Sequence, residues 1–332
     1  MLSITPLVSI CCIAYNHEKF IRSALDGFFI QQTSFAIEIV IHDDASTDNT
    51  TNIILEYQNK YPGSIDIIMQ AENQYSQRGF GFIADLFAKA QGKYIALCEG
   101  DDYWIDPLKL QKQVDFLESN PEFAICFHKV KIEEEGKFKD DYITGGNPPI
   151  VSNIIDLAKG NYIHTPSCVF RNNTSKILGA NFADSPLGDY YINMMNAQYG
   201  NIFHIDEIMA VYRIHSSSTF SSQSRNFQIA KTIKAIEVIS KDLQKQEVEV
   251  RQQLIDAHIH LTMDIYDRSL LIKDFENTSI TFYPSEYRQR LIENLINSEE
   301  KIAILTNQQE SIKWLIMKLV NSVKKRILKI FT

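Results

Sequence analysis

Three carboxylates lie together in one stretch of the chain, Cys98-Glu99-Gly100-Asp101-Asp102. The stretch follows a short apolar run that predicts a strand over 94–98, and it precedes Pro107, which is placed to open a helix. Carboxylate oxygens are the ligands that Mg²⁺ and Mn²⁺ prefer, and these ions also bind the phosphates of substrates. The residue types therefore indicate a divalent-metal site. The alternative is an acidic turn before a helix, because Asp favours both turns and helix starts.

Polar residues also follow two earlier strand signals. Ala14-Tyr15-Asn16 ends a predicted strand over 6–14, and Asp43-Asp44 ends one over 38–42. Neighbouring parallel strands present their carboxyl ends at one edge of a sheet, where ligands bind in open α/β folds. These residues and the acidic stretch could therefore line one site. Taken alone, Asp43-Asp44 is more typical of a turn than of a site.

Strand and helix signals alternate through most of the chain, which predicts an α/β fold with right-handed crossovers. The helical segment over 188–198 opens with Asp189, which could be a helix cap. The segment over 131–150 is polar and contains paired Gly and Pro, which predicts a mobile excursion. The remaining predicted strands are 65–70, 123–130, 167–171, 202–205 and 209–214, and the other helices are 18–30, 50–61, 82–90, 109–119 and 226–273.

Composition narrows the class of protein. The chain has 332 residues, of which 45% are hydrophobic and 22% charged, so it can bury a sizeable core. The net charge of −8 argues against a nucleic-acid partner. Five scattered cysteines, an odd number without metal-ligand spacing, predict buried reduced thiols in a cytoplasmic protein. We expect no secretory signal and no membrane-spanning segment.

Three segments carry a resemblance to a known family: VSICCIAYNHEKFIRSALDGFFIQQ, EIVIHDDASTDNT and GKYIALCEGDDYWIDPLKLQKQVDFL. Together they resemble the family-2 inverting glycosyltransferases of bacterial surface-polysaccharide synthesis. The resemblance implies a GT-A-type, Rossmann-like and mostly parallel sheet flanked by helices, with an α-helical C-terminal region. It also implies transfer of a sugar from a nucleotide-sugar, expected to be a UDP-sugar, to a hydroxyl of a glycan or lipid-linked acceptor, with Mn²⁺ or Mg²⁺ as cofactor.

The resemblance also implies roles for individual residues. Asp189 matches the catalytic base, and metal ligands are expected at Asp101, Asp102 and His215. His215 could instead be an ordinary polar residue at a strand end. The segment over 73–82 departs from the family pattern and offers only Arg78 as a donor contact. The residues implied to bind the donor are Ala14, Tyr15, Asn16, Asp43, Asp44, Arg78, Glu99, Asp101 and Arg213.

The expected chemistry explains why these residue types are needed. A metal ion neutralises the diphosphate as the sugar leaves it, and a carboxylate takes the proton of the attacking hydroxyl. One rival is a non-catalytic module that binds nucleotides or glycans on the same scaffold. A second rival is a nucleotidyltransferase, which should carry a Gly-rich basic loop after the first strand. Residues 14–20 do not form such a loop.

A Ser-rich link over 216–224 predicts a boundary between a catalytic domain, 1–220, and a helical region, 221–332. The last segment, 312–332, combines apolar residues at helical spacing with six basic residues and no acid. This profile predicts a helix lying on an anionic membrane, and hence a peripheral protein at the inner face of the plasma membrane. The alternative is a helix that docks on its own domain or on a second copy in a homo-oligomer.

Overall fold

The computed structural model describes residues 5–144, 148–244, 249–250, 252–254 and 256–257. The chain divides into two compact units, Met1–Ala257 and His258–Thr332. All the elements described below belong to the first unit. The basic segment over 312–332 and the distal part of the predicted helix over 226–273 lie outside the described residues.

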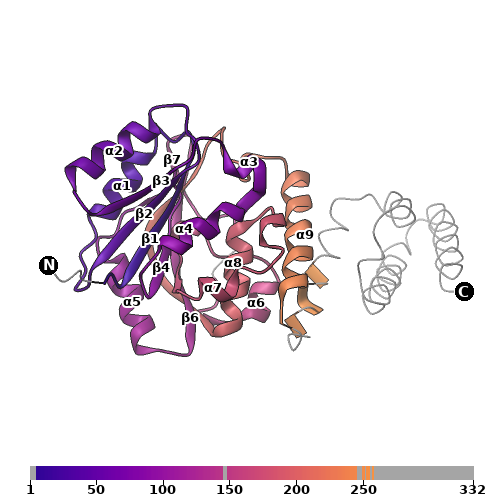
Figure 1. The fold of residues 1–332 in the computed structure, drawn as a ribbon. Coiled ribbons are helices and arrows are strands. Elements are labelled where there is room, and N and C mark those ends of the chain that lie inside the picture. The colour runs from indigo at the N-terminus through magenta and orange to yellow at the C-terminus, as the bar shows by residue number, and fades with distance from the viewer. Residues whose placement is uncertain (1–4, 145–147, 245–248, 251, 255, 258–332) are drawn as a thin grey trace, which may run out of the picture. The chain divides into compact units, whose positions relative to one another are not determined.

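Within the described residues, ten strands form one sheet in the order β3-β2-β1-β4-β9-β6-β10-β5, with β7 paired to β6 and β8 to β10 (Figure 1). Their bounds are β1 (Val8–Ala14), β2 (Ile37–Asp43), β3 (Ile65–Met69), β4 (Tyr94–Leu97), β5 (Tyr103–Trp104), β6 (Phe123–Glu134), β7 (Lys137–Asp140), β8 (Val151–Ser152), β9 (Val169–Arg171) and β10 (Asn201–Ile214).

The direction of the strands changes in the middle of the sheet. β3, β2, β1 and β4 are parallel, as the alternating pattern predicts. β9 then runs antiparallel to both β4 and β6, while β10 is parallel to β6. The sheet is therefore parallel in its N-terminal half and mixed in the rest. The carboxyl ends of β1, β2 and β4 share one edge, as expected.

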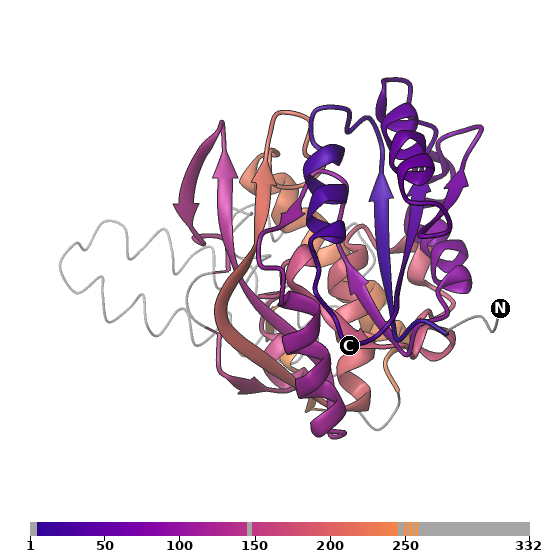
Figure 2. The same ribbon diagram turned by 90° about the vertical axis from the view of Figure 1, so that its left-hand side faces the viewer.

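Helices cover both faces of the sheet, which is why β1 is apolar on both sides. Alternate residues of β1, such as Ile10 and Cys12, pack in a core with α1 and α5 (Figure 2). The five cysteines are buried and free, as predicted. The helices are α1 (Ile21–Phe29), α2 (Thr50–Lys60), α3 (Gln74–Arg78), α4 (Ile83–Lys89), α5 (Lys109–Ser119), α6 (Ile154–Ala158), α7 (Thr174–Ile177), α8 (Gly188–Asn196) and α9 (Arg225–Asp242).

The structure corrects the expectation of an irregular excursion over 131–150. β6 continues to Glu134, turns through Glu135 and Gly136, which both have positive φ, and returns as β7. Ion pairs join the two strands, among them Lys131–Asp140 at 2.5 Å. Cross-strand charge pairs replace the apolar alternation in this exposed hairpin, so the sequence pattern did not reveal it.

The two strands predicted over 202–205 and 209–214 form one long strand, β10. The register with β6 shifts between Ile205 and Ile208, where Asp206 and Glu207 interrupt the apolar pattern. A bulge thus accommodates the charged pair without ending the strand.

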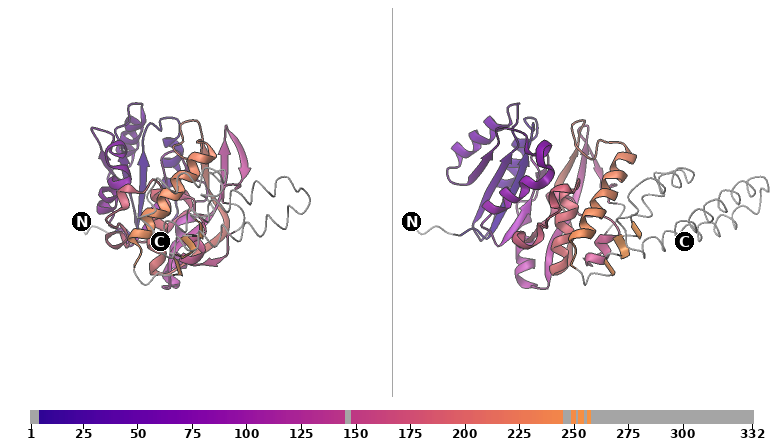
Figure 3. Two further views of the ribbon diagram at one scale, coloured as in Figure 1. Left: turned by 90° about the vertical axis from the view of Figure 1, so that its right-hand side faces the viewer. Right: turned by 45° about the vertical axis from the view of Figure 1, so that its right-hand side comes forward.

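α9 begins directly after the predicted Ser-rich link, and it packs beside α8 (Figure 3). Near its end, the Asp242 carboxylate accepts hydrogen bonds from Tyr191 Oη at 2.6 Å and from Asn181 Nδ2 at 2.6 Å. The first compact unit includes α9 and extends to Ala257. No helix in the described part of the chain is long and apolar enough to cross a membrane.

Candidate active site

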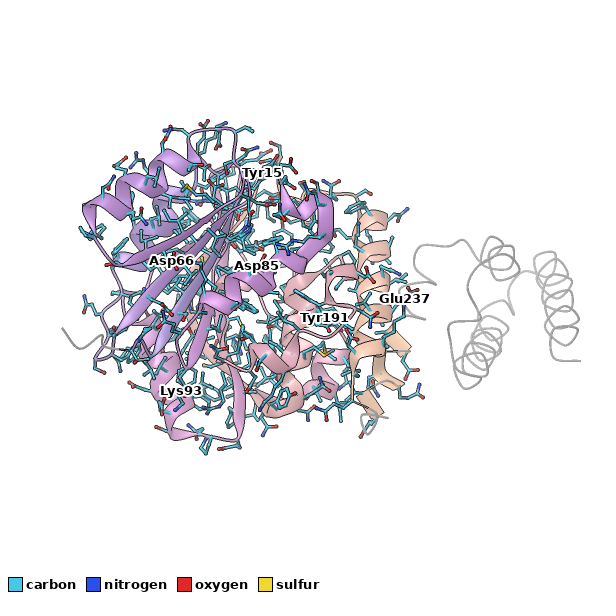
Figure 4. The ribbon with its side chains drawn as sticks, in the orientation of Figure 1. Tyr15, Asp66, Asp85, Lys93, Tyr191 and Glu237 are labelled. Atoms are coloured by element: carbon cyan, nitrogen blue, oxygen red, sulfur yellow. The ribbon has the colours of Figure 1, made fainter. Side chains whose placement is uncertain are left out.

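The site lies at the sheet edge where the parallel strands end. Figure 4 marks this edge with Tyr15, which follows β1, and the opposite edge with Lys93, which precedes β4. Beyond β4 the chain stays close to β1, because Gly100 N donates to Ile13 O at 2.8 Å. A Cβ on Gly100 would lie 2.8 Å from His17 Nδ1 and 2.9 Å from Ile21 Cδ1. The glycine is therefore needed for close packing of the acidic stretch against the residues after β1.

The acidic stretch forms a tight cluster. Glu99, Asp101 and Asp102 each offer an oxygen, and these atoms all lie within 4.8 Å of one another. Asp102 is buried, and its Oδ1 accepts the Arg213 N–H at 2.8 Å. Asp102 Oδ2 and Asp101 Oδ1 are buried and have no hydrogen-bond partner among the residues that the structure describes. Buried oxygens without donors are costly, and a cation would satisfy them, so the cluster fits a divalent metal.

The carboxylates in this cluster repel one another when they are ionised. Burial, followed by the charges of Asp101 and Asp189, raises the pKa of Glu99 to about 8. Burial and the neighbouring carboxylates also raise the pKa of Asp102 well above its usual range. Burial acts on Asp101 in the same sense, but His17 and His215 outweigh it and hold the pKa of Asp101 below its ordinary value. A bound cation would relieve the repulsion that raises the first two pKa values.

Two histidines flank Asp101. His215, predicted as a metal ligand, has Nε2 3.1 Å from Asp101 Oδ2, and its ring stacks on Phe20 at 4.4 Å. His17 Nε2 lies 3.7 Å from the same oxygen. The sequence interpretation did not include His17. The sequence feature that could have indicated His17 is its position directly after Asn16, at the end of the first strand.

The sequence predicts that Arg213 contacts the nucleotide-sugar donor. In the structure its guanidinium donates hydrogen bonds to other groups of the protein. Nε donates to Glu133 Oε2 at 3.0 Å, Nη1 to Asp101 O at 3.0 Å, and Nη2 to Ser23 Oγ at 3.2 Å. The guanidinium also lies 4.1 Å from the centre of the Tyr103 ring. Arg213 thus ties α1 and β6 to the acidic stretch. Glu133 was missed because it lies in the segment expected to be irregular.

Asp43 and Asp44, predicted to contact the nucleotide, lie beside Ala14: Asp44 N donates to Ala14 O at 2.9 Å. Both carboxylates are buried and accept hydrogen bonds from nearby loops. Asp44 accepts the N–H groups of Gln74 at 2.6 Å and Tyr75 at 3.0 Å, at the start of α3. The two aspartates therefore fix the loops around the expected nucleotide position.

The other residues that are predicted to bind the nucleotide-sugar donor lie in different environments. Asn16 has φ 56°, and its Oδ1 accepts the Thr47 N–H at 2.8 Å, which joins the loops after β1 and β2. Tyr15 is 44% exposed at the same edge. Arg78, at the end of α3, forms an exposed ion pair with Asp85.

Asp189 lies in the first turn of α8 and is half-buried. Burial raises the pKa of Asp189 above its ordinary value, although the N–H groups of Asp189 and Tyr190 and the Asn161 side chain oppose this. Asp189 and Glu99 line one cavity of about 50 Å³, whose other walls are mainly apolar side chains of β1, β4 and α4 and of η1 (Gly79–Phe82). The predicted base and Glu99 of the acidic cluster therefore border the same cavity.

A buried network supports the segment that borders this cavity. Trp104 Nε1 donates to Pro166 O at 2.8 Å, and Gln113 Nε2 donates to Ser167 O at 2.9 Å. Lys109 Nζ donates to Gln113 at 2.8 Å and lies 4.1 Å from the centre of the Trp104 ring. This network holds Thr165, which lines the cavity. Trp104 is an anchor of the core, at 1% exposure.

Comparison with protein families gives one match: residues 9–216 match the family described as Glycosyl transferase family 2. An uncharacterized protein of Mycobacterium tuberculosis is 40% identical over 223 residues, which are 65% of this chain and 61% of that protein. The chain therefore spans about three-fifths of the length of this relative. An Escherichia coli protein named UDP-Glc:alpha-D-GlcNAc-diphosphoundecaprenol beta-1,3-glucosyltransferase WfaP is 35% identical over 148 residues, 44% of this chain and 53% of that protein.

Among solved structures, residues 1–349 of TarS from S. aureus align with a TM-score of 0.57 at 15% identity. The alignment covers 80% of this chain and 78% of the TarS chain. The same part of TarS in complex with UDP aligns with a TM-score of 0.54 at 17% identity, over 82% of this chain and 76% of that chain. At this level of identity the likeness shows a shared fold.

Proposed function

Because the chain belongs to glycosyl transferase family 2 and has the expected GT-A-type fold, we propose that it moves a sugar from a nucleotide-sugar to a hydroxyl of an acceptor. The observation that carries this proposal is the shared cavity, which Glu99 of the acidic cluster and Asp189 both line. A UDP-sugar donor is supported by the name of the E. coli relative and by the UDP complex of TarS. The same name supports a lipid-linked glycan as acceptor.

Mn²⁺ or Mg²⁺ fits the acidic cluster. Asp101 and Asp102 would hold it through their unpartnered buried oxygens, and His215 is placed to contribute Nε2. When bound, such an ion supplies positive charge that stabilises the departing diphosphate. Arg213 has a supporting role in this proposal, because its three guanidinium nitrogens already donate to Glu133, Asp101 and Ser23.

Asp189 is the proposed general base of an inverting transfer. The acceptor oxygen forms a bond to the anomeric carbon as its proton passes to the Asp189 carboxylate, and the electron pair of the broken C–O bond leaves with the nucleoside diphosphate. Burial raises the pKa of Asp189, which makes its carboxylate a stronger base than an exposed aspartate. Its half-buried position leaves room for an acceptor to reach it.

The proposal is tested first by ligand binding and then by turnover. UDP-sugars should raise the melting temperature of the protein in the presence of Mn²⁺ and not in EDTA, because a ligand that binds only the folded state stabilises it. An acceptor should then increase the release of UDP. Release of pyrophosphate would indicate a nucleotidyltransferase instead, and binding without any turnover would indicate a non-catalytic module.

We also propose that the segment over 312–332 binds the inner face of the plasma membrane, because it carries six basic residues and no acid. Each Lys or Arg near an anionic surface adds about 1 kcal/mol, so binding should depend on lipid charge and on salt. The full chain should sediment with anionic vesicles at low salt and be partly released at high salt. A chain ending at Glu310 should lose this sedimentation and keep UDP release.

The docking alternative predicts a different result for the same pair of proteins. Removal of the segment would then lower the melting temperature, and neither protein would sediment with vesicles. Equal sedimentation with neutral and anionic vesicles would contradict the electrostatic part of the proposal.

A further inference from the structure

Asn161 lies in the loop that joins α6 to the short η2 helix (Thr165–Ser167). Its Nδ2 donates a hydrogen bond to Asp189 Oδ2 at 2.9 Å. Its Oδ1 accepts the N–H of Ile163 at 3.2 Å. Because a backbone N–H can only donate, this second bond fixes which end of the amide faces Ile163. The NH₂ group must then point at Asp189.

The hydrogen bond gives the Asp189 carboxylate a partner outside its own helix. Among the described residues, Asn161 is the only side chain that is hydrogen-bonded to Asp189. Oδ2 therefore carries a donor from a loop outside the helix, in addition to the N–H groups of Asp189 and Tyr190 that donate to the same carboxylate.

We propose that Asn161 is a positioning residue for the transfer: through its hydrogen bond to Oδ2 it orients the Asp189 carboxylate that takes the acceptor's proton. The inference rests on the proposed function of Asp189. In the step, the acceptor O–H bond breaks and an O–H bond forms on the Asp189 carboxylate, while the Asn161 NH₂ keeps both of its protons. The acceptor oxygen bonds to the anomeric carbon as the sugar leaves the diphosphate.

Asn161 also acts on the charge state of the base. The ionisable groups around Asp189 are Glu99 beyond β4, His164 before η2, Cys168 after it, and Tyr190 in α8. Glu99, when ionised, favours the neutral acid, whereas the Asn161 donor favours the carboxylate. The same hydrogen bond thus orients the base and, together with the N–H groups of Tyr190 and Asp189, favours its ionised form.

The test compares Asn161→Asp with Asn161→Ala. Asn161→Asp keeps an oxygen for the Ile163 N–H but places a second carboxylate against Asp189. Loss of a hydrogen bond to a charged group corresponds to about a 10-fold loss of kcat for Asn161→Ala, and the added like charge to about 100-fold for Asn161→Asp. In both variants KM for the donor should stay unchanged, and the acid side of the kcat profile should move to higher pH.

Asn153→Ala is the matched control. Asn153 caps α6, which packs on α8 and precedes the same loop, and its side chain accepts the N–H groups of Ile155 and Asp156. This variant should lower the melting temperature and leave the acid side of the kcat profile in place. If Asn161→Ala also changes only the melting temperature, the positioning role is wrong and Asn161 is merely structural.

Asp189→Asn separates this inference from the function on which it rests. If Asp189→Asn abolishes turnover while both Asn161 variants keep the wild-type pH profile, the inference alone fails. If Asp189→Asn keeps its turnover, the assignment of the base fails, and the role of Asn161 fails with it.

Discussion

Asp102→Asn is expected to reduce sugar transfer by at least about 1000-fold, because it removes one charge from the metal site without changing its shape. The Asn oxygen can still accept the Arg213 N–H, so the NH₂ group takes the place of Oδ2, the buried oxygen that has no partner. An NH₂ group cannot bind a cation. The measurement is release of nucleoside diphosphate with Mn²⁺ and an acceptor.

The melting temperature distinguishes this effect from loss of the fold. The pKa of Asp102 is raised in the folded protein, so its charge is disfavoured there and a neutral Asn should leave the metal-free protein equally or more stable. The increase in melting temperature that Mn²⁺ causes should disappear. Asp115→Asn, at an exposed position on α5, is the control and should change neither property. Wild-type turnover in the Asp102 variant with EDTA present would contradict the metal site.

Asp189→Asn is expected to lower kcat by at least about 100-fold, because the amide keeps the size of the carboxylate and loses its basicity. KM for the donor should change little. In the wild-type protein, transfer should decline on the acid side at a pH above the usual pKa of an aspartate, because burial raises the pKa of Asp189 and the base is protonated below that pKa. A kcat profile with pH, measured for both proteins, tests this.

Asp184→Asn provides the control for the second substitution. Asp184 is exposed and lies five positions before Asp189 in the chain, so its loss of charge should leave kcat unchanged. A different result for Asp189→Asn, in which kcat is retained and KM for the donor rises, would make Asp189 a binding residue.

The sequence was sufficient to predict the parallel half of the sheet and the position of the acidic stretch. Each strand there is a short apolar run that ends in a polar residue, so the pattern and the topology rule agree. The same rule predicted that Ala14, Asp43 and Asp44 lie at one edge of the sheet, and the structure shows them there. It did not show that Asp44 accepts hydrogen bonds from N–H groups at the start of α3, because these partners are 30 and 31 residues away.

The contacts that complete the site come from long-range packing, which a local pattern cannot show. Glu133 and Asn161 are ordinary polar residues in their own segments. Their roles appear only when β6 brings Glu133 to Arg213 and the loop before η2 brings Asn161 to Asp189. The hairpin of β6 and β7 was missed for a related reason, since charge pairs across two strands leave no apolar period in either strand.

The bonds from β10 to the acidic stretch determine when the site can form during synthesis. Arg213 N–H reaches Asp102 across 111 residues of chain, and His215 reaches Asp101 across 114. A nascent chain that has left the ribosome only as far as β9 carries the carboxylates without these partners. Closing such long loops is slow compared with forming local helices. These hydrogen bonds can thus form only after β10 has been synthesised, which places the completion of the acidic site late in folding.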